Sequence, residues 1–166
     1  APAMRWGGIG WVLLAAVGSA EDSASRPKDP VGSAVRELTG SRTRVVWRQD
    51  ITDRSGRAAP RLMGFDSDDG RGTRVILGAP FNYSKPLLTY DGKRVVFSNM
   101  MVNRVYVVNF DGTGVREVTK GFAADLWRDP VTGREWLYYK TQQNKDWKKD
   151  KEAPVRRALL DDPAVD

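Results

Sequence analysis

Short apolar runs recur along the chain from about Val35 onward, and polar or glycine-containing segments separate them. Three of these runs carry a basic residue at or near their start: Thr43–Trp47, Lys93–Phe97 and Arg134–Tyr138. β-Branched and aromatic residues dominate all three, which is typical of β-strands. The pattern therefore predicts strands over most of this region.

Each of these runs is followed by a second apolar run that ends in Asp or Asp-Gly. The second runs are 61–66, 105–112 and 157–161. In the first two sets a third run follows, and it closes on Gly78 or on Gly121. The sets therefore repeat with a period in the low forties, close to the ~40–45 residues of one four-stranded propeller blade.

The repeats predict an all-β chain made of β-propeller blades, each with four antiparallel strands. We expect about three blades, at residues 35–78, 79–121 and 122–166. The second blade shows its four strands most clearly, at 85–89, 94–98, 104–110 and 115–119. A closed ring needs at least about four blades. We therefore expect an incomplete ring, with an apolar face bare at each end, and a chain that is the N-terminal part of a larger propeller.

The second blade resembles the repeat of the TolB-type β-propellers. The resemblance rests on Ser84–Ser98, Arg104–Gly112 and Val115–Thr119, which follow that family's order of strands and Asp-Gly turns. Thr89-Tyr90 stands where Ser-Pro is usual, and Arg128-Asp129-Pro130 fills the same corner of the third blade. The resemblance implies a ring of about six blades. It implies a fold and no activity, because the matching residues are structural.

The N-terminal residues 1–20 have the pattern of a signal peptide. Met4-Arg5 precedes the apolar run Trp6–Val17, and Gly18 and Ala20 supply the small residues of a cleavage site. The run is too short for a span of about 20 residues, although a short anchor or a buried helix is the alternative. We expect translation to start at Met4 and residues 21–34 to form a flexible linker. We expect the protein to be periplasmic or secreted, with no stable membrane span after cleavage.

The composition limits the kinds of catalytic and metal-binding site that the chain can form. The chain has neither Cys nor His, which excludes disulfides, thiolate zinc sites, a Cys nucleophile and a His base. The net charge is +6, but Asp146 and Asp150 interrupt the one basic cluster, 145–151. We therefore expect no nucleic-acid partner, no cofactor, no metal site and no catalytic residues in this region.

The candidate binding residues are Asn82, Tyr83, Lys85 and Asp125. They lie just before or within the predicted innermost strands, which line the central channel of a propeller and its mouth. The alternative is that these residues hold channel water and cap the backbone.

Two other groups have competing interpretations. Asp66, Asp68 and Asp69 have the spacing of a calcium loop, but the distal Glu is missing, so a hairpin turn is favoured. The aromatic residues Trp127, Trp136, Tyr138 and Tyr139 suit either a sugar platform or packing between blades, and packing is favoured. Trp147 lies in a charged stretch and is equally consistent with an exposed contact or a buried position.

These patterns indicate an exported, non-catalytic propeller that binds or scaffolds a protein, a peptide or a glycan. One alternative is a propeller enzyme, which the absence of His disfavours. Another is the propeller portion of a larger hydrolase or peptidase whose catalytic domain is not in this chain. That alternative requires a Gly-x-Ser-x-Gly motif in further sequence.

Overall fold

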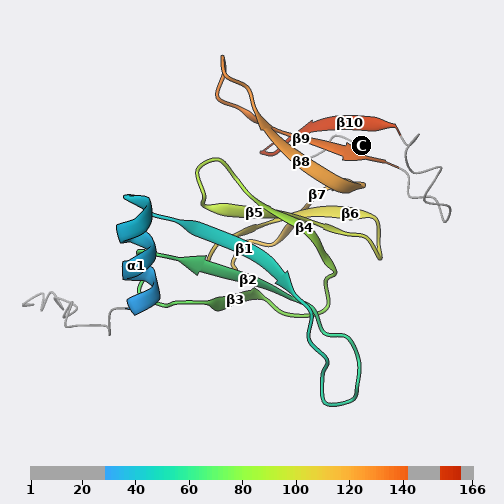
Figure 1. Cartoon of the computed structure of the whole chain (residues 1–166). Coiled ribbons are helices and arrows are strands. Elements are labelled where there is room, and N and C mark those ends of the chain that lie inside the picture. Colours follow the sequence, from blue (N-terminus) through green and yellow to red (C-terminus); the bar gives the residue numbers. More distant parts are fainter. Residues whose placement is uncertain (1–28, 142–153, 162–166) are drawn as a thin grey trace, which may run out of the picture.

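The computed structural model describes residues 29–141 and 154–161 (Figure 1). The described residues form one helix and three antiparallel sheets stacked one upon another (Figure 1). The first sheet contains β1 (Arg44–Gln49), β2 (Arg61–Asp66) and β3 (Arg74–Leu77). The second contains β4 (Tyr83–Leu88), β5 (Arg94–Asn99), β6 (Arg104–Asn109) and β7 (Arg116–Lys120). The third contains β8 (Phe122–Arg128), β9 (Glu135–Lys140) and β10 (Val155–Leu159).

The predicted fold class is confirmed: the chain is mostly β, and its strands form successive antiparallel sheets in an open stack. The second sheet has all four predicted strands, in the order β4-β5-β6-β7. Three strands are described in each of the other two sheets. Within the described residues, no helix is long and apolar enough to cross a bilayer. The predicted signal peptide at 1–20 lies outside the described residues.

The predicted linker at 21–34 differs from the structure in its last residues. Residues 30–34 begin helix α1 (Pro30–Thr39), and residues 21–28 lie outside the described part. The Asp29 side chain accepts a hydrogen bond from the backbone N–H of Val31, Pro30 occupies the first turn, and Gly40 ends the helix with φ 69°. These are ordinary helix start and stop signals, so the helix was predictable from the sequence.

The second sheet is covered on both faces. Val95, Phe97 and Val108 point toward the first sheet, where they pack with Leu62 and Ile76. The alternate residues point the other way, because successive side chains of a strand lie on opposite faces. The residues that form this other core are Val96, Val105 and Val107, with Leu137, Tyr139 and Leu160 of the third sheet and its flank. The two cores therefore fix the order of the stack.

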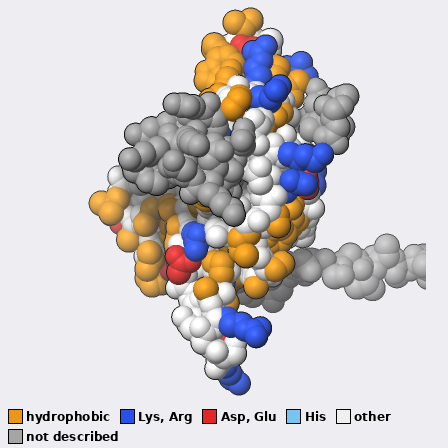
Figure 2. Space-filling view, turned by 90° about the vertical axis from the view of Figure 1, so that its right-hand side faces the viewer, with side chains coloured by type: hydrophobic (Ala, Val, Ile, Leu, Met, Phe, Trp, Pro, Cys, Tyr) orange, Lys and Arg blue, Asp and Glu red, His pale blue; other side chains and the backbone are white. Residues whose placement is uncertain are grey.

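The two ends of the stack differ in character. The turns at 89–93 and 129–134 lie at the end that also carries α1, and this is called the turn end below (Figure 1). Figure 2 looks onto the opposite end, where hydrophobic side chains alternate with Lys and Arg and few acidic side chains are visible. The β5–β6 turn contributes Met101 and Val102, which are 79% and 51% exposed. Asp66, Asp68 and Asp69, whose carboxylates pair with arginines, belong to the turn end.

Asp66 ties the first sheet together at the turn end. Its carboxylate is 1% exposed and accepts hydrogen bonds from Arg42 Nε (3.0 Å) and Arg44 Nε (2.7 Å). Arg44 also donates to the carbonyl of Gly92 in the second sheet, and its guanidinium lies 4.7 Å from the ring centre of Phe110. Residues 67–73 connect β2 to β3, so the turn interpretation is confirmed for Asp68 and Asp69, whereas Asp66 is the last residue of β2 and acts as a buried anchor.

The arginines also set the acidity of this carboxyl group. Burial alone raises the pKa of Asp66, but hydrogen bonds from Arg42 and Arg44, and from the backbone N–H of Asp68, outweigh burial. The pKa of Asp66 is therefore held well below its ordinary value. The neighbouring carboxylates are paired as well, Asp68 with Arg36 and Asp69 with Arg74.

Asp66→Asn is expected to lower the free energy of unfolding by about 2–3 kcal/mol, because it leaves two arginines without their buried partner. Urea unfolding followed by circular dichroism measures this loss. Asp50→Asn is the matched control, since the Asp50 side chain is 69% exposed and pairs only at the surface with Arg48. The control is expected to change stability by less than about 0.5 kcal/mol. Equal effects of the two substitutions would contradict the role of Asp66.

The contribution of Asp66 also depends on pH in a defined direction. Because its native pKa is depressed, its stabilisation is complete well above about pH 4 and is lost as the pH falls through that value toward the native pKa. The stability difference between wild type and Asp66→Asn is therefore expected to be constant from pH 7 to pH 5 and about 1 kcal/mol smaller at pH 3. A difference that is the same at pH 3 and pH 7 would show that the carboxylate is not held by the arginines.

Candidate functional site

A pocket of about 270 Å³ lies between the second and third sheets at the turn end. Both sheets and both of their first turns contribute to its lining. This set of residues, called the turn pocket below, comprises Asp91, Arg94, Arg128, Gly133, Arg134, Glu135, Leu159 and Asp161. Three arginines and three carboxylates therefore surround one cavity, which suits polar or charged ligand groups.

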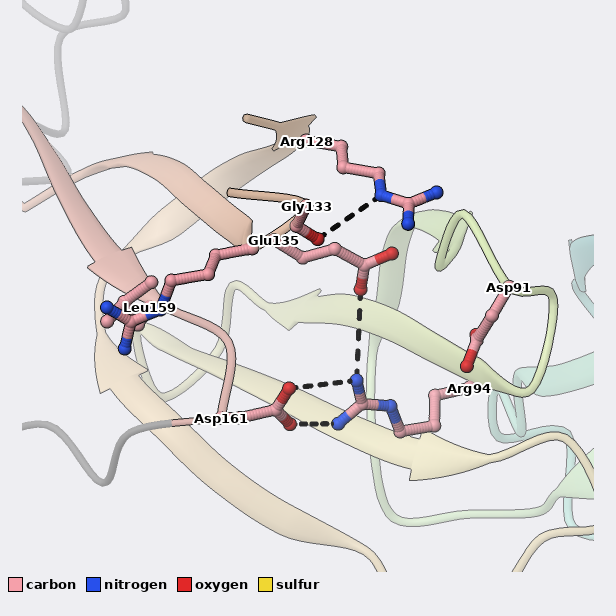
Figure 3. Close-up of a pocket in the computed structure, with 8 residues that line it drawn as sticks. Asp91, Arg94, Arg128, Gly133, Glu135, Leu159 and Asp161 are labelled. Atoms are coloured by element: carbon pink, nitrogen blue, oxygen red, sulfur yellow. Dashed lines mark hydrogen bonds and ion pairs between the residues drawn. The ribbon is translucent and has the colours of Figure 1, made fainter. Parts of the chain in front are cut away.

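Arg94 spans the pocket from the first residue of β5. Its guanidinium forms two hydrogen bonds to the carboxylate of Asp161, one of them 3.3 Å long, and approaches Glu135 Oε2 at 3.8 Å (Figure 3). The hydrogen bond with Asp161 raises the pKa of Arg94 and lowers the pKa of Asp161. Arg116 adds a hydrogen bond of 2.6 Å to the carbonyl of Leu160. These contacts fasten the third sheet to the second.

Glu135 lines the turn pocket, and its side chain is 11% exposed. One carboxylate oxygen accepts a hydrogen bond of 2.8 Å from the backbone N–H of Tyr90. The other oxygen is buried and has no hydrogen-bond partner among the described residues. This oxygen faces the guanidinium of Arg94 at 3.8 Å, and the ion pair offsets part of the cost of burying it.

Arg128 and Asp91 lie at the rim of the pocket, and the two side chains do not form an ion pair with each other (Figure 3). Arg128 donates from Nε to the carbonyl of Gly133 (3.2 Å), and no carboxylate pairs with it within the described residues. The hydrogen bonds from Thr89 Oγ1 (2.6 Å) and the backbone N–H of Lys93 hold Asp91 in place and lower its pKa. The rim therefore offers one cation and one anion to an incoming group.

A second, more apolar hollow lies beside the turn pocket, between the inner strands β4 and β8. This set, called the axial hollow below, encloses about 220 Å³ and is lined by Leu87, Leu88, Tyr90, Asp125 and Leu126. Tyr90 connects the two cavities, because it lines the axial hollow and its backbone N–H donates to Glu135, which lines the turn pocket. The Tyr90 side chain is free to meet a ligand, since the residue is 56% exposed.

Two of the predicted binding residues lie together, as a pair. Lys85 Nζ lies 2.6 Å from Asp125 Oδ2, and the two side chains are 45% and 62% exposed. The pair joins β4 to β8 at their β-bulges, where Lys85 and Ala123 both adopt positive φ. Asn82 lies apart from them and accepts a hydrogen bond of 2.8 Å from Arg48 of the first sheet.

The prediction for Tyr83 is wrong, because its side chain is in the core. It is 0% exposed, packs against Phe97 with ring centres 5.0 Å apart, and donates its hydroxyl to the carbonyl of Gly78. Burial raises the pKa of Tyr83 to about 12. Tyr83 occupies the position of a strand residue that faces the neighbouring sheet, which the sequence pattern does not distinguish from one that faces the channel.

The aromatic residues of the third sheet divide between its two faces. Tyr139 is buried against the second sheet, as the packing interpretation predicts. Trp127 and Tyr138 lie on the opposite face, with ring centres 6.4 Å apart, and Trp127 is 42% exposed. Trp147 lies outside the described residues.

The residues that form the turn pocket were not among the predicted site residues. Arg94 and Asp161 are 67 positions apart in the chain, and no local motif joins them. One signal was present: Arg94 is the basic residue at the start of an apolar run, a feature that recurs at Arg44. In the structure, both arginines reach across to the next sheet.

No protein-family model and no curated protein sequence matches the chain. Solved structures match at low similarity. TolB from Acinetobacter baumannii has 15% identity and a TM-score of 0.42, over 80% of this chain and 44% of that chain. A nidogen/laminin complex has 19% identity and a TM-score of 0.38, over 61% of this chain and 41% of that chain. The chain thus spans less than half the length of the two structures, and these likenesses assign it neither a family nor a function.

Proposed function

We propose that this chain is an exported, non-catalytic β-propeller module that binds a peptide segment of a partner protein at its turn end. The observation that supports the proposal is the pair of cavities on either side of Tyr90. One is the charged turn pocket, and the other is the more apolar axial hollow. Protein-binding surfaces commonly combine an aromatic contact, an apolar recess and a polar rim.

The axial hollow suits an apolar side chain of the peptide. Leu87, Leu88 and Leu126 supply its apolar lining, and the exposed ring of Tyr90 offers a further contact surface. Tyr contributes large contact area at a low cost in conformational entropy, which is why it is frequent at protein interfaces. An apolar side chain buried here is expected to anchor the peptide.

The turn pocket suits the neighbouring polar residues of the same peptide. Arg128 offers N–H donors to a carboxylate, while Asp91 offers an acceptor to an amine or amide. A neutral glycan lacks charges for this rim, so a peptide carrying both signs of charge is the better ligand. The Lys85–Asp125 pair belongs to the same surface and supplies charges beside the apolar anchor.

Binding is tested by fluorescence anisotropy with labelled peptides. One peptide places an aromatic residue between Glu and Lys, a second is a neutral Ser/Gly peptide, and a neutral oligosaccharide is the third probe. We expect only the mixed-charge peptide to bind, and Tyr90→Ala or Arg128→Ala to weaken it by about tenfold or more. Val131→Ala is the matched control, because Val131 lies in the adjacent turn, is 90% exposed and lines neither cavity.

Binding of the oligosaccharide alone would overturn the peptide assignment. Equal affinity of the wild type, Tyr90→Ala and Arg128→Ala would place any binding elsewhere. Absence of binding by all three probes would contradict the proposed function.

We also propose that the chain acts outside the cytoplasm, on the basis of the signal-peptide pattern at 1–20. Expressed from Met4 in a Gram-negative bacterium, the protein is expected in the periplasm or medium with Glu21 as its first residue. Leu13→Arg combined with Leu14→Arg interrupts the apolar run and is expected to block export. N-terminal sequencing of the fractions decides this. An uncleaved wild-type chain in the cytoplasm would contradict the proposal.

A further inference from the structure

The end of the stack opposite the turn end carries the β1–β2 connection (residues 50–60) and the β5–β6 turn (residues 100–103), and it is called the loop end below. Both connections follow strands that begin at the turn end, so they project in the same direction from neighbouring sheets (Figure 1). A further sheet packed on the outward face of the first or third sheet would extend the stack sideways. The loop end would therefore stay accessible in a longer stack.

Three consecutive apolar residues form the tip of the β5–β6 turn. Met100, Met101 and Val102 are 37%, 79% and 51% exposed. Asn99 Oδ1 accepts a hydrogen bond from the backbone N–H of Met101 (3.3 Å), and Arg104 Nη1 donates to the carbonyl of Val102 (3.2 Å). Turns are ordinarily polar, and a run of three exposed apolar residues is unusual unless it has a function. The turn is thus held by its own polar contacts and presents apolar side chains outward.

The β1–β2 connection forms a small hairpin that presents two arginines. An isolated β-bridge closes the hairpin. Asp53 Oδ1 accepts hydrogen bonds from the backbone N–H groups of Ser55 (2.8 Å) and Arg57 (2.9 Å), and from Ser55 Oγ (2.6 Å). Arg54 and Arg57 are exposed, and in the part of the chain that the structure describes their side chains have no ion-pair or hydrogen-bond partner. The hairpin therefore holds two unpaired cations in place.

The charges of the loop end are unbalanced. Arg61, the first residue of β2, is a third exposed arginine whose side chain has no partner within residues 29–141 and 154–161. The nearby carboxylates are already engaged: Asp50 pairs with Arg48, Glu117 pairs with Arg104, and the hairpin carboxylate accepts the hydrogen bonds described above. Figure 2 shows the result, with blue and orange side chains together and few red ones.

We propose that the loop end is a peripheral binding surface for a bilayer that contains anionic lipids. The apolar side chains of the β5–β6 turn enter the boundary between headgroups and acyl chains, and the unpaired arginines contact lipid phosphates. A bilayer accounts for both features, because a projecting apolar tip enters lipid without needing a matching pocket. A soluble polyanion would engage the arginines and leave the methionines in water. The surface stands apart from the turn pocket and does not depend on the proposed function.

A fluorescent label at the turn tip tests whether the loop end contacts lipid. The chain has no cysteine of its own, so Met101→Cys and Val131→Cys each accept one environment-sensitive label, at the loop end and the turn end respectively. Vesicles of phosphatidylglycerol and phosphatidylcholine in equal parts are expected to shift the emission at Met101→Cys to shorter wavelength and to leave Val131→Cys unchanged. Vesicles of phosphatidylcholine alone are expected to change neither. Both variants keep the full chain, so the N-terminal residues are the same in each.

The arginines are tested by co-sedimentation with the same anionic vesicles. Each cation at an anionic surface contributes about fivefold in affinity, so Arg54→Gln combined with Arg57→Gln is expected to weaken binding by about tenfold or more. Arg71→Gln combined with Lys93→Gln is the matched control, because it removes the same charge from the turn end. The control is expected to weaken binding by less than about threefold.

Circular dichroism of each variant establishes that it is folded before the vesicles are added. An unchanged emission at Met101→Cys on anionic vesicles would overturn the proposal. Equal losses in the two double variants would also overturn it, since attraction would then depend on net charge alone. Tighter binding to polyglutamate or single-stranded DNA than to the vesicles would assign the loop end to a soluble anionic partner instead.

Discussion

The second sheet is apolar on both faces, so each face must pack against another sheet. This constraint determines where the first and third sheets lie. Val95 and Val96 are neighbours in the chain, yet they belong to two different cores, because successive side chains of a strand point to opposite faces. A sheet of this kind loses stability unless both faces are covered. The stack of three is the smallest arrangement that covers both faces of the second sheet, and it leaves the outward faces of the first and third sheets without a described partner.

Arginines at the turn end complement the apolar packing. Arg44 opens β1 and reaches the carbonyl of Gly92 in the second sheet, while Arg94 opens β5 and reaches Asp161 and Glu135 beside the third. Asp66 supports Arg44 from its own sheet. These contacts tie the sheets together at one end, and the turn pocket lies where the second and third sheets are joined in this way. The proposed peptide site is therefore a consequence of how the sheets are joined.

The sequence predicted the repeating strands well, because strand composition and turn residues are local signals. Helix α1 was not predicted, although Asp29, Pro30 and Gly40 are local signals too. The reason is that the strand repeat was assumed to begin at Val35, which lies within the helix. The sequence pattern misplaced Tyr83, since the side of a strand that faces a core depends on the neighbouring sheet. It named Lys85 and Asp125 separately as binding residues, and the structure shows that they form an ion pair. The turn pocket depends on residues 67 positions apart that only the folded stack brings together.

The stacking order is the central claim, and nuclear Overhauser contacts between methyl groups test it most directly. The account predicts contacts from Val95 and Val108 to Leu62 and Ile76, and from Val96 and Val107 to Leu137 and Leu160. It predicts none between Ile76 and Leu137, which belong to different cores. Observation of both predicted sets in solution would support the stack. Absence of either set, or a direct contact between Ile76 and Leu137, would contradict it.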